Sequence, residues 1–302
     1  MSQKIETKQE WAVASYALND AYTDFILSRQ AMLCSPQTLR WYRVILGMVL
    51  GWLIENGVTS PDQITARHVR AYLSTLAGKG LSDSYIHGQA RVLRTYVRFL
   101  HKEKYIPELI EFIMPTIAQK RLLVFNAVQV QQIISSCQNF RDKALLLLMV
   151  DSGLRRAEVC ALDWGNVDIS SGLVRVERGK GGKARSVVIG VHTRRAVLKY
   201  RRDINHDDDE PLFQTNGGKR ITDNGLRSLI NRVGNQAGIH ITPHALRRTF
   251  ATLSLRAGMN LLQLQGLLGH STLEMTRHYV EMLEEDLVKA HREHGPIDSI
   301  FP

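Results

Sequence analysis

The sequence predicts a mainly helical protein with one small β-hairpin, an α+β fold arranged in two domains. Three observations support this prediction. The length of 302 residues is about twice that of a typical domain. Apolar residues recur with a helical period on both sides of a single pair of alternating segments. Between residues 104 and 125 this period is lost, and Pro107 and Pro115 interrupt the chain as they do in a connection between domains.

The first domain, residues 17 to 104, is predicted to contain four amphipathic helices. Their expected ranges are 19–30, 36–56, 65–78 and 82–101. Ser35 followed by Pro36 provides an N-cap and a first-turn proline for the second helix, and Gly57 ends that helix. Residues 1 to 16 are expected to form a short N-terminal extension, and residues 105 to 125 the connection to the second domain.

The fourth of these helices has an apolar face and a basic face. The apolar stripe consists of Val92, Tyr96, Phe99 and Leu100, and the basic stripe of Arg91, Arg94, Arg98 and Lys102. A basic stripe is most often a solvated helix face. The excess of positive charge in the whole chain favours the other interpretation, that this face contacts phosphate groups.

The second domain is predicted to be a set of helices around a β-hairpin. Helices are expected at 127–137, 141–151 and 155–162, strands at 173–178 and 185–189, and helices again at 192–203, 222–237, 243–257, 260–268 and 272–281. A final amphipathic piece covers 284–293. The two strands are joined by the sequence GKGGKA, so the hairpin has a basic tip.

Composition and charge narrow the class of partner. Lys and Arg number 39 against 29 Asp and Glu, a formal net charge of +10, which makes a polyanion the leading partner. The hydrophobic content of 44% indicates a folded protein rather than a disordered basic tail. The widely spaced Cys34, Cys137 and Cys160 argue against a disulfide framework or zinc knuckle and favour a reducing compartment. No signal-like or membrane-spanning run is present, so we expect an intracellular protein without a membrane partner.

Three familiar kinds of site fit the sequence poorly. A P-loop requires Gly-x-x-x-x-Gly-Lys-Ser/Thr at the start of a helix, whereas strands flank the glycine-rich tip. The four carboxylates at 207–210 precede Pro211 and are typical of a solvated turn rather than a two-metal site. His240 and His244 have Pro243 between them and lack an HExxH context, so zinc is not favoured. We therefore expect no metal and no cofactor.

The remaining candidates are cations and proton donors: Arg155, Lys180, His244, Arg247, His270 and Tyr279. Each alone has an ordinary explanation, such as an ion pair between Arg155 and Glu158. Together they fit the transfer of a phosphodiester. Two guanidiniums can clamp the nonbridging oxygens in a bidentate way, a phenol can attack phosphorus in line, and a hairpin lysine can protonate the departing 5′ oxygen.

These residues lie in segments that resemble the motifs of the tyrosine recombinases, the phage integrase family. Asp151–Glu158 with Leu162–Trp164 resembles the first-arginine box, Gly179–Gly181 the lysine turn, His244–Ala251 the HxxR helix, Leu268–His270 the LGH box and Thr276–Tyr279 the nucleophile segment. The order and spacing of the segments agree with the family. The resemblance extends over most of the chain and is closest to the compact Xer-like members.

The resemblance implies a role for each candidate residue. Tyr279 would form a covalent 3′-phosphotyrosine and release a 5′ hydroxyl, which attacks the partner duplex by way of a Holliday junction. The other assignments are Arg155 and Arg247 on the scissile phosphate, Lys180 as the acid for the leaving group, His244 in acid/base assistance, His270 in a phosphate hydrogen bond and Glu158 as the group that orients Arg155. Because the phosphotyrosine keeps the bond energy, neither ATP nor a metal would be needed.

The resemblance also implies an architecture and partners. Residues 17–104 would be the SAM-like core-binding domain, 126–283 the catalytic domain, and 284–302 a C-terminal helix and tail that a neighbouring protomer receives. The expected DNA contacts are Arg91, Arg94, Arg98, Lys102, Lys183 and Arg185. The expected assembly is a monomer when free and a tetramer on two double-stranded DNA sites, in the cytoplasm and associated with the nucleoid. A related recombinase or an accessory DNA-bending protein is a further expected partner.

Several alternatives stay open at this level. A type IB topoisomerase would share the tyrosine chemistry, a catalytically silent DNA-binding regulator would share the fold, and an RNA-binding protein would share the charge. Within the recombinases, the sequence does not distinguish resolution of chromosome dimers from integration or excision of a mobile element.

Overall fold

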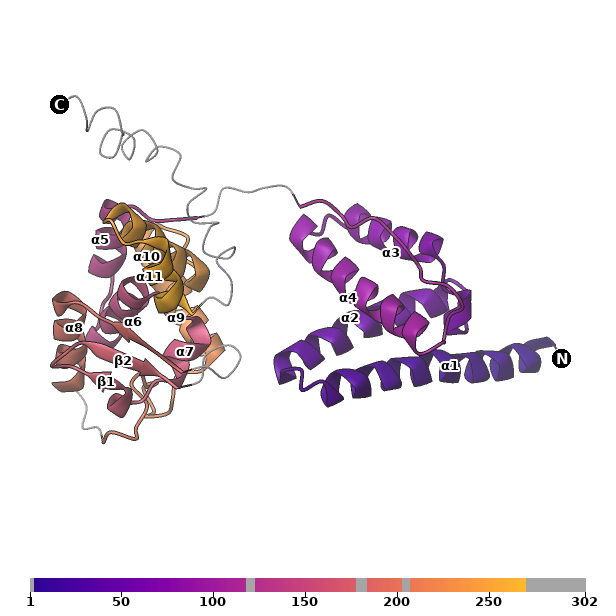
Figure 1. Ribbon diagram of the computed structural model, residues 1–302, viewed down its shortest axis with the longest axis horizontal. Coiled ribbons are helices and arrows are strands. Elements are labelled where there is room, and N and C mark those ends of the chain that lie inside the picture. Colours follow the sequence, from indigo (N-terminus) through magenta and orange to yellow (C-terminus); the bar gives the residue numbers. More distant parts are fainter. Residues whose placement is uncertain (1–2, 118–122, 178–183, 203–206, 270–302) are drawn as a thin grey trace, which may run out of the picture. The chain divides into compact units, whose positions relative to one another are not determined.

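The computed structural model describes residues 3–117, 123–177, 184–202 and 207–269, with the backbone alone for residues 3–16. The chain divides into two compact units, residues 1–120 and 121–302, each with its own hydrophobic core. Figure 1 shows that the first unit is helical and that the sheet belongs to the second. This is the mainly α fold with a small sheet that the sequence predicts.

The N-terminal unit contains four helices, as predicted. They are α1 (Gln3–Ala31), α2 (Pro36–Glu55), α3 (Ala66–Gly78) and α4 (Asp83–Lys102), with a short 3-10 turn at Pro61–Gln63. The predicted start of the first helix is wrong, because α1 begins at Gln3 and includes most of the segment predicted as an extension. No proline or glycine stands between residues 3 and 31 to end a helix there, and the segment is rich in good helix formers.

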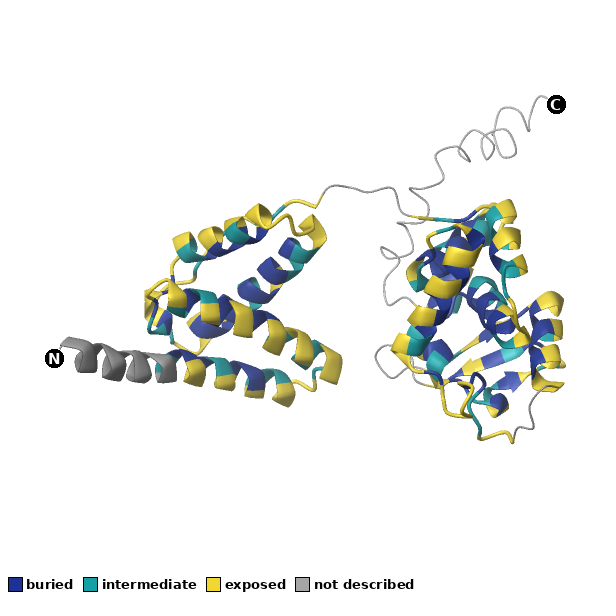
Figure 2. Cartoon of the chain, turned by 180° about the vertical axis from the view of Figure 1, so that it is seen from behind, coloured by how far each residue is buried: buried dark blue, intermediate teal, exposed yellow. Residues whose placement is uncertain are grey.

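Local capping and aromatic packing define this unit. The side chain of Ser35 accepts a hydrogen bond from the backbone N–H of Thr38 at 3.2 Å and begins α2 as predicted. In the core, the Phe25 ring makes edge contacts with Tyr42, Tyr96 and Phe99 at centroid distances of 5.1 to 5.3 Å. Figure 2 shows that buried positions of this unit lie where its helices face one another and that exposed positions lie on their other sides.

Part of the segment predicted as a connection packs on the N-terminal unit. Four of its apolar residues lie against the core of that unit, although they follow no helical period: Tyr105, Ile110, Phe112 and Met114. His87 Nδ1 lies 2.8 Å from the carbonyl oxygen of Pro115, and Arg94 donates to the carbonyl of Phe112 at 3.5 Å. Residues 105–115 therefore form a strap along α4, which local sequence patterns cannot indicate because the contacts are long-range.

The C-terminal unit surrounds a three-stranded antiparallel sheet with helices. Its elements are α5 (Ala127–Ser135), α6 (Phe140–Ser152), α7 (Arg156–Ala161), a 3-10 turn (Trp164–Asn166), β1 (Val167–Asp168), β2 (Leu173–Val176), β3 (Arg185–Val188), α8 (Val191–Arg202), α9 (Asp223–Ala237), α10 (Pro243–Arg256) and α11 (Leu261–Leu268). The strand order is β1-β2-β3, with Val176 opposite Arg185. Strand β1 was not predicted, since two residues are too few for a visible alternation.

Helix α6 forms the centre of this unit. Its residues Ala144, Leu145, Leu146, Leu148 and Met149 are fully buried, and it packs against α5, α8, α10 and strand β3. Because α6 is surrounded on most sides, it is apolar around its circumference rather than along one stripe. It ends where the first-arginine box begins, so the core of the unit directly supports that box. The helices predicted at 272–281 and 284–293 lie outside the described residues.

Candidate active site

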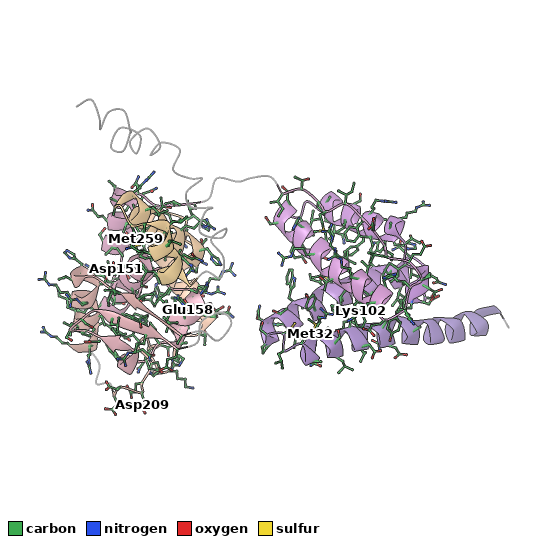
Figure 3. The ribbon with its side chains drawn as sticks, viewed as in Figure 1. Met32, Lys102, Asp151, Glu158, Asp209 and Met259 are labelled. Carbon is green, nitrogen blue, oxygen red and sulfur yellow. The ribbon has the colours of Figure 1, made fainter. Side chains whose placement is uncertain are left out.

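The first-arginine box begins with a turn that only glycine fits. Gly153 ends α6 with φ +62°, and a Cβ atom at this position would lie 2.2 Å from Cδ1 of Phe250. Just before it, the Asp151 carboxylate accepts hydrogen bonds from the backbone N–H of Gly190 and the hydroxyl of Thr193, each at 2.6 Å. Figure 3 labels Asp151 at this end of α6. The box is thereby joined both to the start of α8 and to α10.

Glu158 on α7 binds two arginines from different elements. Its Oε1 accepts from Nη1 of Arg155 and from Nη1 of Arg185, both at 2.8 Å. Its Oε2 accepts from the backbone N–H of Arg155 and from Nη2 of Arg185, both at 2.7 Å. The carboxylate therefore holds the catalytic candidate Arg155 on one side and receives a bidentate arginine fork on the other. Glu158, labelled in Figure 3, is 4% exposed.

These hydrogen bonds keep Glu158 ionised. Burial alone would raise the pKa of its carboxyl group, but the hydrogen bonds and charges of Arg185 and Arg155 outweigh burial and lower the pKa from 4.5 to about 2. A buried carboxylate without such partners would be costly. The prediction that Glu158 lies beside Arg155 agrees with the observed distance; its role in orienting Arg155 stays a prediction.

Arg247 is buried in the first turns of α10. Its residue is 5% exposed, its Nη1 donates to the carbonyl of Gly153 at 2.5 Å, and its Nη2 donates to the carbonyl of Leu268 at 2.7 Å. Helix α10 begins with a Thr242 cap, whose hydroxyl accepts from the N–H of Ala245 at 3.1 Å, followed by Pro243 at the first helical position. The guanidinium is therefore fixed by main-chain carbonyls of the protein.

Three arginines meet the C-terminal end of α11. Arg185 Nε donates to the carbonyl of Leu267 at 3.0 Å, Arg247 Nη2 to that of Leu268, and Arg155 Nη2 to that of Gly269 at 3.0 Å. The last carbonyls of a helix lack partners within the helix and carry its negative dipole end, so cations are favourable there. The structure thus brings Arg155 and Arg247, 92 positions apart (247 − 155), to the turn that immediately precedes His270.

His244 lies at the exposed start of α10. Partial withdrawal of its ring from water, and the positive charges of Arg248, Arg247, Arg156 and Arg155, lower its pKa from the ordinary value of 6.5. A neutral imidazole at neutral pH can accept a proton, which is the property that an acid/base residue needs.

Some predicted site residues cannot be placed in the structure. Lys180, Lys183, His270, Tyr279 and residues 284–302 lie outside the described residues. Among the residues that are described, no group of three or more His, Cys, Asp or Glu side chains could hold a metal ion. The described helices also include none long and apolar enough to cross a membrane.

The predicted DNA contacts differ in their surroundings. Arg91, Arg98 and Lys102 are exposed on α4, as a phosphate contact requires. Arg94 is half-buried, and its guanidinium lies 5.8 Å from the centre of the Phe112 ring, so it packs against the strap.

Arg185, a predicted DNA contact, has its partners within the protein, and its contact with DNA stays a prediction. The exposure of its side chain is only 11%, and its guanidinium donates to both oxygens of Glu158 and to the carbonyl of Leu267. Sequence reasoning missed this role because Glu158 is 27 positions away. A signal was present nevertheless. In an alternating strand, Arg185 shares a face with Val187, which is buried.

Comparison with known proteins decides the family. The model of the phage integrase family matches residues 123–286, more than half of the chain, and the model of the phage integrase N-terminal SAM-like domain matches residues 20–104. The chain belongs to the phage integrase family. It is therefore a tyrosine recombinase, an enzyme that cleaves and rejoins DNA.

Curated relatives match this tyrosine recombinase over most of its length. Tyrosine recombinase XerC of Xanthomonas campestris pv. campestris (strain B100) is 30% identical over 265 residues, which cover 85% of this chain and 82% of the relative. Tyrosine recombinase XerA of Saccharolobus solfataricus is 29% identical over 277 residues, 89% of this chain and 90% of the relative. The Xer-like character expected from the motifs is thereby confirmed.

Solved structures share the fold of this tyrosine recombinase. A lambda integrase dimer bound to a COC′ core site superposes with a TM-score of 0.74 at 18% identity, covering 87% of this chain and 94% of that chain. The crystal structure of XerA recombinase gives a TM-score of 0.53 at 25% identity, covering 92% and 99%. The two-domain prediction of a SAM-like domain and an integrase catalytic domain agrees with these matches.

Proposed function

We propose that Arg155 and Arg247 clamp the scissile phosphate while Tyr279 cleaves the strand. The observation that carries this proposal is the convergence of the two guanidiniums on the turn before His270, with Glu158 holding one of them. Guanidiniums fixed in advance stabilise the charge that develops on the nonbridging oxygens in the transition state, at little cost in reorganisation.

The proposed reaction balances without an external energy source. The Tyr279 hydroxyl attacks phosphorus, a bond forms between the phenolic oxygen and phosphorus, and the bond from phosphorus to the 5′ oxygen breaks. His244 assists removal of the phenolic proton, Lys180 gives a proton to the leaving 5′ oxygen, and His270 donates a hydrogen bond to the phosphate. The 5′ hydroxyl of a partner strand then attacks the 3′-phosphotyrosine in the reverse sense, and a Holliday junction links the two exchanges.

A covalent trap tests the nucleophile. The probe is a duplex selected from random DNA by binding to the full chain, and nicked a few nucleotides 3′ of the cleavage point so that the short product strand diffuses away. We expect the native chain to accumulate a 3′-linked adduct and Tyr279→Phe to bind the same duplex without one. Tyr22→Phe, in the N-terminal unit, should form the adduct normally. An adduct on the Tyr279→Phe variant would contradict the assignment.

We further propose that double-stranded DNA sites assemble the protein from monomers into a tetramer on two duplexes. The relatives' solved complexes include a dimer on a core site and XerH bound to a palindromic substrate, which supports binding to paired half-sites. Residues 284–302 are proposed to dock on the neighbouring protomer, because Leu287, Ala290 and His291 recur at helical spacing and a short terminal helix gains stability mainly by docking.

Truncation after Leu283 tests this assembly. We expect the truncated chain to bind a single half-site normally, to fill the second half-site with less cooperativity, and to lose strand exchange more than first-strand cleavage. Equal cooperativity and equal recombination by the full and truncated chains would contradict docking in trans.

The biological role is proposed to be Xer-like resolution in the cytoplasm, on nucleoid DNA, with a related recombinase or a DNA-bending protein as a further partner. The names of the curated relatives support this over integration or excision of a mobile element. Mapping the selected site in the source genome distinguishes the two roles, since a mobile element would carry the site at its ends.

A further inference from the structure

Arg185 donates three hydrogen bonds within the described part of the site, yet the proposed chemistry gives it no role. It begins strand β3, opposite Val176 of β2. Its Nη1 and Nη2 donate to Oε1 and Oε2 of Glu158 at 2.8 and 2.7 Å, and its Nε donates to the carbonyl of Leu267 at 3.0 Å. One side chain therefore joins the sheet, α7 and the end of α11.

The two ends of this bridge are the supports of catalytic groups. Glu158 binds both Nη1 and the backbone N–H of Arg155. Leu267 lies near the end of α11, three positions before His270. The carbonyls of the next two residues, Leu268 and Gly269, accept hydrogen bonds from Arg247 and Arg155 respectively. A shift of Arg185 would therefore move the supports of Arg155 and of the turn together.

The packing around the guanidinium leaves little room for another arrangement. The exposure of the Arg185 side chain is 11% and that of Glu158 is 4%. A Cβ atom on Gly269 would lie 3.0 Å from Cδ and 3.1 Å from Nε of Arg185, so the chain passes directly over the guanidinium. A planar fork with three donors in fixed directions fits these acceptors, whereas the single ammonium of lysine cannot reach a carboxylate bidentately and a carbonyl at once.

We propose that Arg185 is a positioning residue, which holds Glu158 and the Leu267–Gly269 turn so that Arg155 and His270 meet the scissile phosphodiester in register. This inference rests on the proposed function of the site. It replaces the predicted contact of Arg185 with DNA by an indirect effect on the rate of cleavage. Small displacements of groups that stabilise a transition state lower the rate much more than they lower affinity for the substrate.

Single-turnover cleavage of the nicked duplex described above tests this role. We expect Arg185→Lys to lower the rate constant of adduct formation by about 10- to 100-fold, with the final amount of adduct unchanged. Affinity for the intact duplex should change by less than about threefold, because one buried cation replaces another. Arg175→Lys is the matched control, since Arg175 is exposed on the adjacent strand β2 and has Ser186 as its partner residue. This control should cleave at the native rate.

The final amount of adduct distinguishes a positioning role of Arg185 from a loss of folded protein. A variant that is merely destabilised loses adduct in proportion to its unfolded fraction while the remaining molecules react at the native rate, and that result would overturn the proposal. A native rate for Arg185→Lys would overturn it as well. Loss of affinity that equals the loss of rate would restore a direct DNA contact in its place.

A double-mutant cycle tests the route through Glu158. If Arg185 acts through this carboxylate, Glu158→Gln with Arg185→Gln should be no more than about threefold slower than the slower single variant, as expected for coupled residues. Rate losses that multiply would contradict that route. The native chain tests the proposed function separately. If the native chain forms no adduct at Tyr279, the catalytic assignment is contradicted. If the native chain forms the adduct and Arg185→Lys cleaves at the same rate, only the positioning role is contradicted.

Discussion

The arginines of the two units differ in their exposure and in their hydrogen-bond partners. On α4 of the N-terminal unit, Arg91 and Arg98 are exposed to solvent. In the C-terminal unit, Arg155 and Arg247 donate to carbonyls and to Glu158, and Arg247 is 5% exposed. Solvated cations contribute mainly to affinity for the phosphate backbone, whereas fixed ones can stabilise a transition state. The same residue type is therefore expected to control binding in one unit and rate in the other.

The cores of the two units differ in the same sense. The described core of the N-terminal unit is apolar and aromatic, with Gln89 as its buried polar residue. The C-terminal unit buries the charged side chains of Asp142, Glu158 and Arg247. Burial of charge is costly unless the partners are well placed. Glu158 and Arg247 find their partners among the segments of the candidate site, whereas Asp142 pairs with Arg141 and Arg232 away from it. Four experiments sharpen or break this comparison.

The largest effect is expected from the fixed arginines. Arg155→Lys and Arg247→Lys keep the charge but lose the planar fork, so each should slow single-turnover cleavage by about 10²- to 10³-fold, on the order of 3 to 4 kcal/mol of transition-state stabilisation. Affinity for the duplex should change little. Arg98→Lys on α4 is the control and should cleave normally. Near-native cleavage by both site variants would remove the distinction between the units.

The next effect concerns two glycines. Gly153→Ala places a Cβ atom 2.2 Å from Phe250 at φ +62°, and should destabilise the C-terminal unit by about 3 kcal/mol. Gly51 is an exposed residue of α2, and a Cβ atom added there would have no other atom within 4 Å. Gly51→Ala should therefore stabilise the N-terminal unit by about 0.5 to 1 kcal/mol. Calorimetric unfolding of the full chain measures both. Equal shifts for the two variants would show that the box turn tolerates a side chain.

A smaller effect is expected from pH. The pKa of Glu158 is about 2 in the folded chain against 4.5 ordinarily, so its ionised form stabilises the fold above about pH 4.5, and this contribution disappears as pH falls toward 2. The stability difference between the native chain and Glu158→Gln should therefore shrink by about 2 kcal/mol between about pH 7 and about pH 3. Denaturant unfolding at both pH values measures it. A difference that does not depend on pH would contradict the ion pairs.

The smallest effect is expected on α4. Arg91→Gln and Arg98→Gln should each weaken duplex binding by about 1 kcal/mol and reduce the slope of log affinity against log salt by about 1, as loss of one phosphate contact does. The cleavage rate at saturating DNA should stay the same. Asp20→Asn serves as the control, because Asp20 is an exposed residue of α1 and its substitution also changes the net charge by one. An unchanged salt slope in both variants would mean that this face is simply solvated.

Local signals were sufficient for much of the fold. The predicted Ser35 cap with Pro36 begins α2 in the structure. The helices predicted at 141–151 and 243–257 agree with α6 and α10 within one residue at each end. These signals act between residues a few positions apart. The motifs could be recognised for the same reason, since each box is a short continuous segment.

The remaining features depend on contacts between distant segments. The strap on α4 has no helical period, and His87 and Arg94 of α4 contact it at the carbonyls of Pro115 and Phe112. Arg185 occupies a basic hairpin, where local charge suggests phosphate contact, but the fold supplies Glu158 as its partner. A charged residue at a buried strand position is the sequence feature that could have indicated a partner within the protein.

The arginines at the end of α11 also determine how freely this segment can drift during evolution. They bind main-chain carbonyls, which every amino acid carries, so other apolar residues at position 267 would keep the same hydrogen bond. Gly269 has no such freedom, because its φ of +61° and its closeness to Arg185 exclude a side chain. Homologous chains can therefore vary the side chains of this helix end while retaining its geometry, provided that the glycine and the three arginines are inherited together.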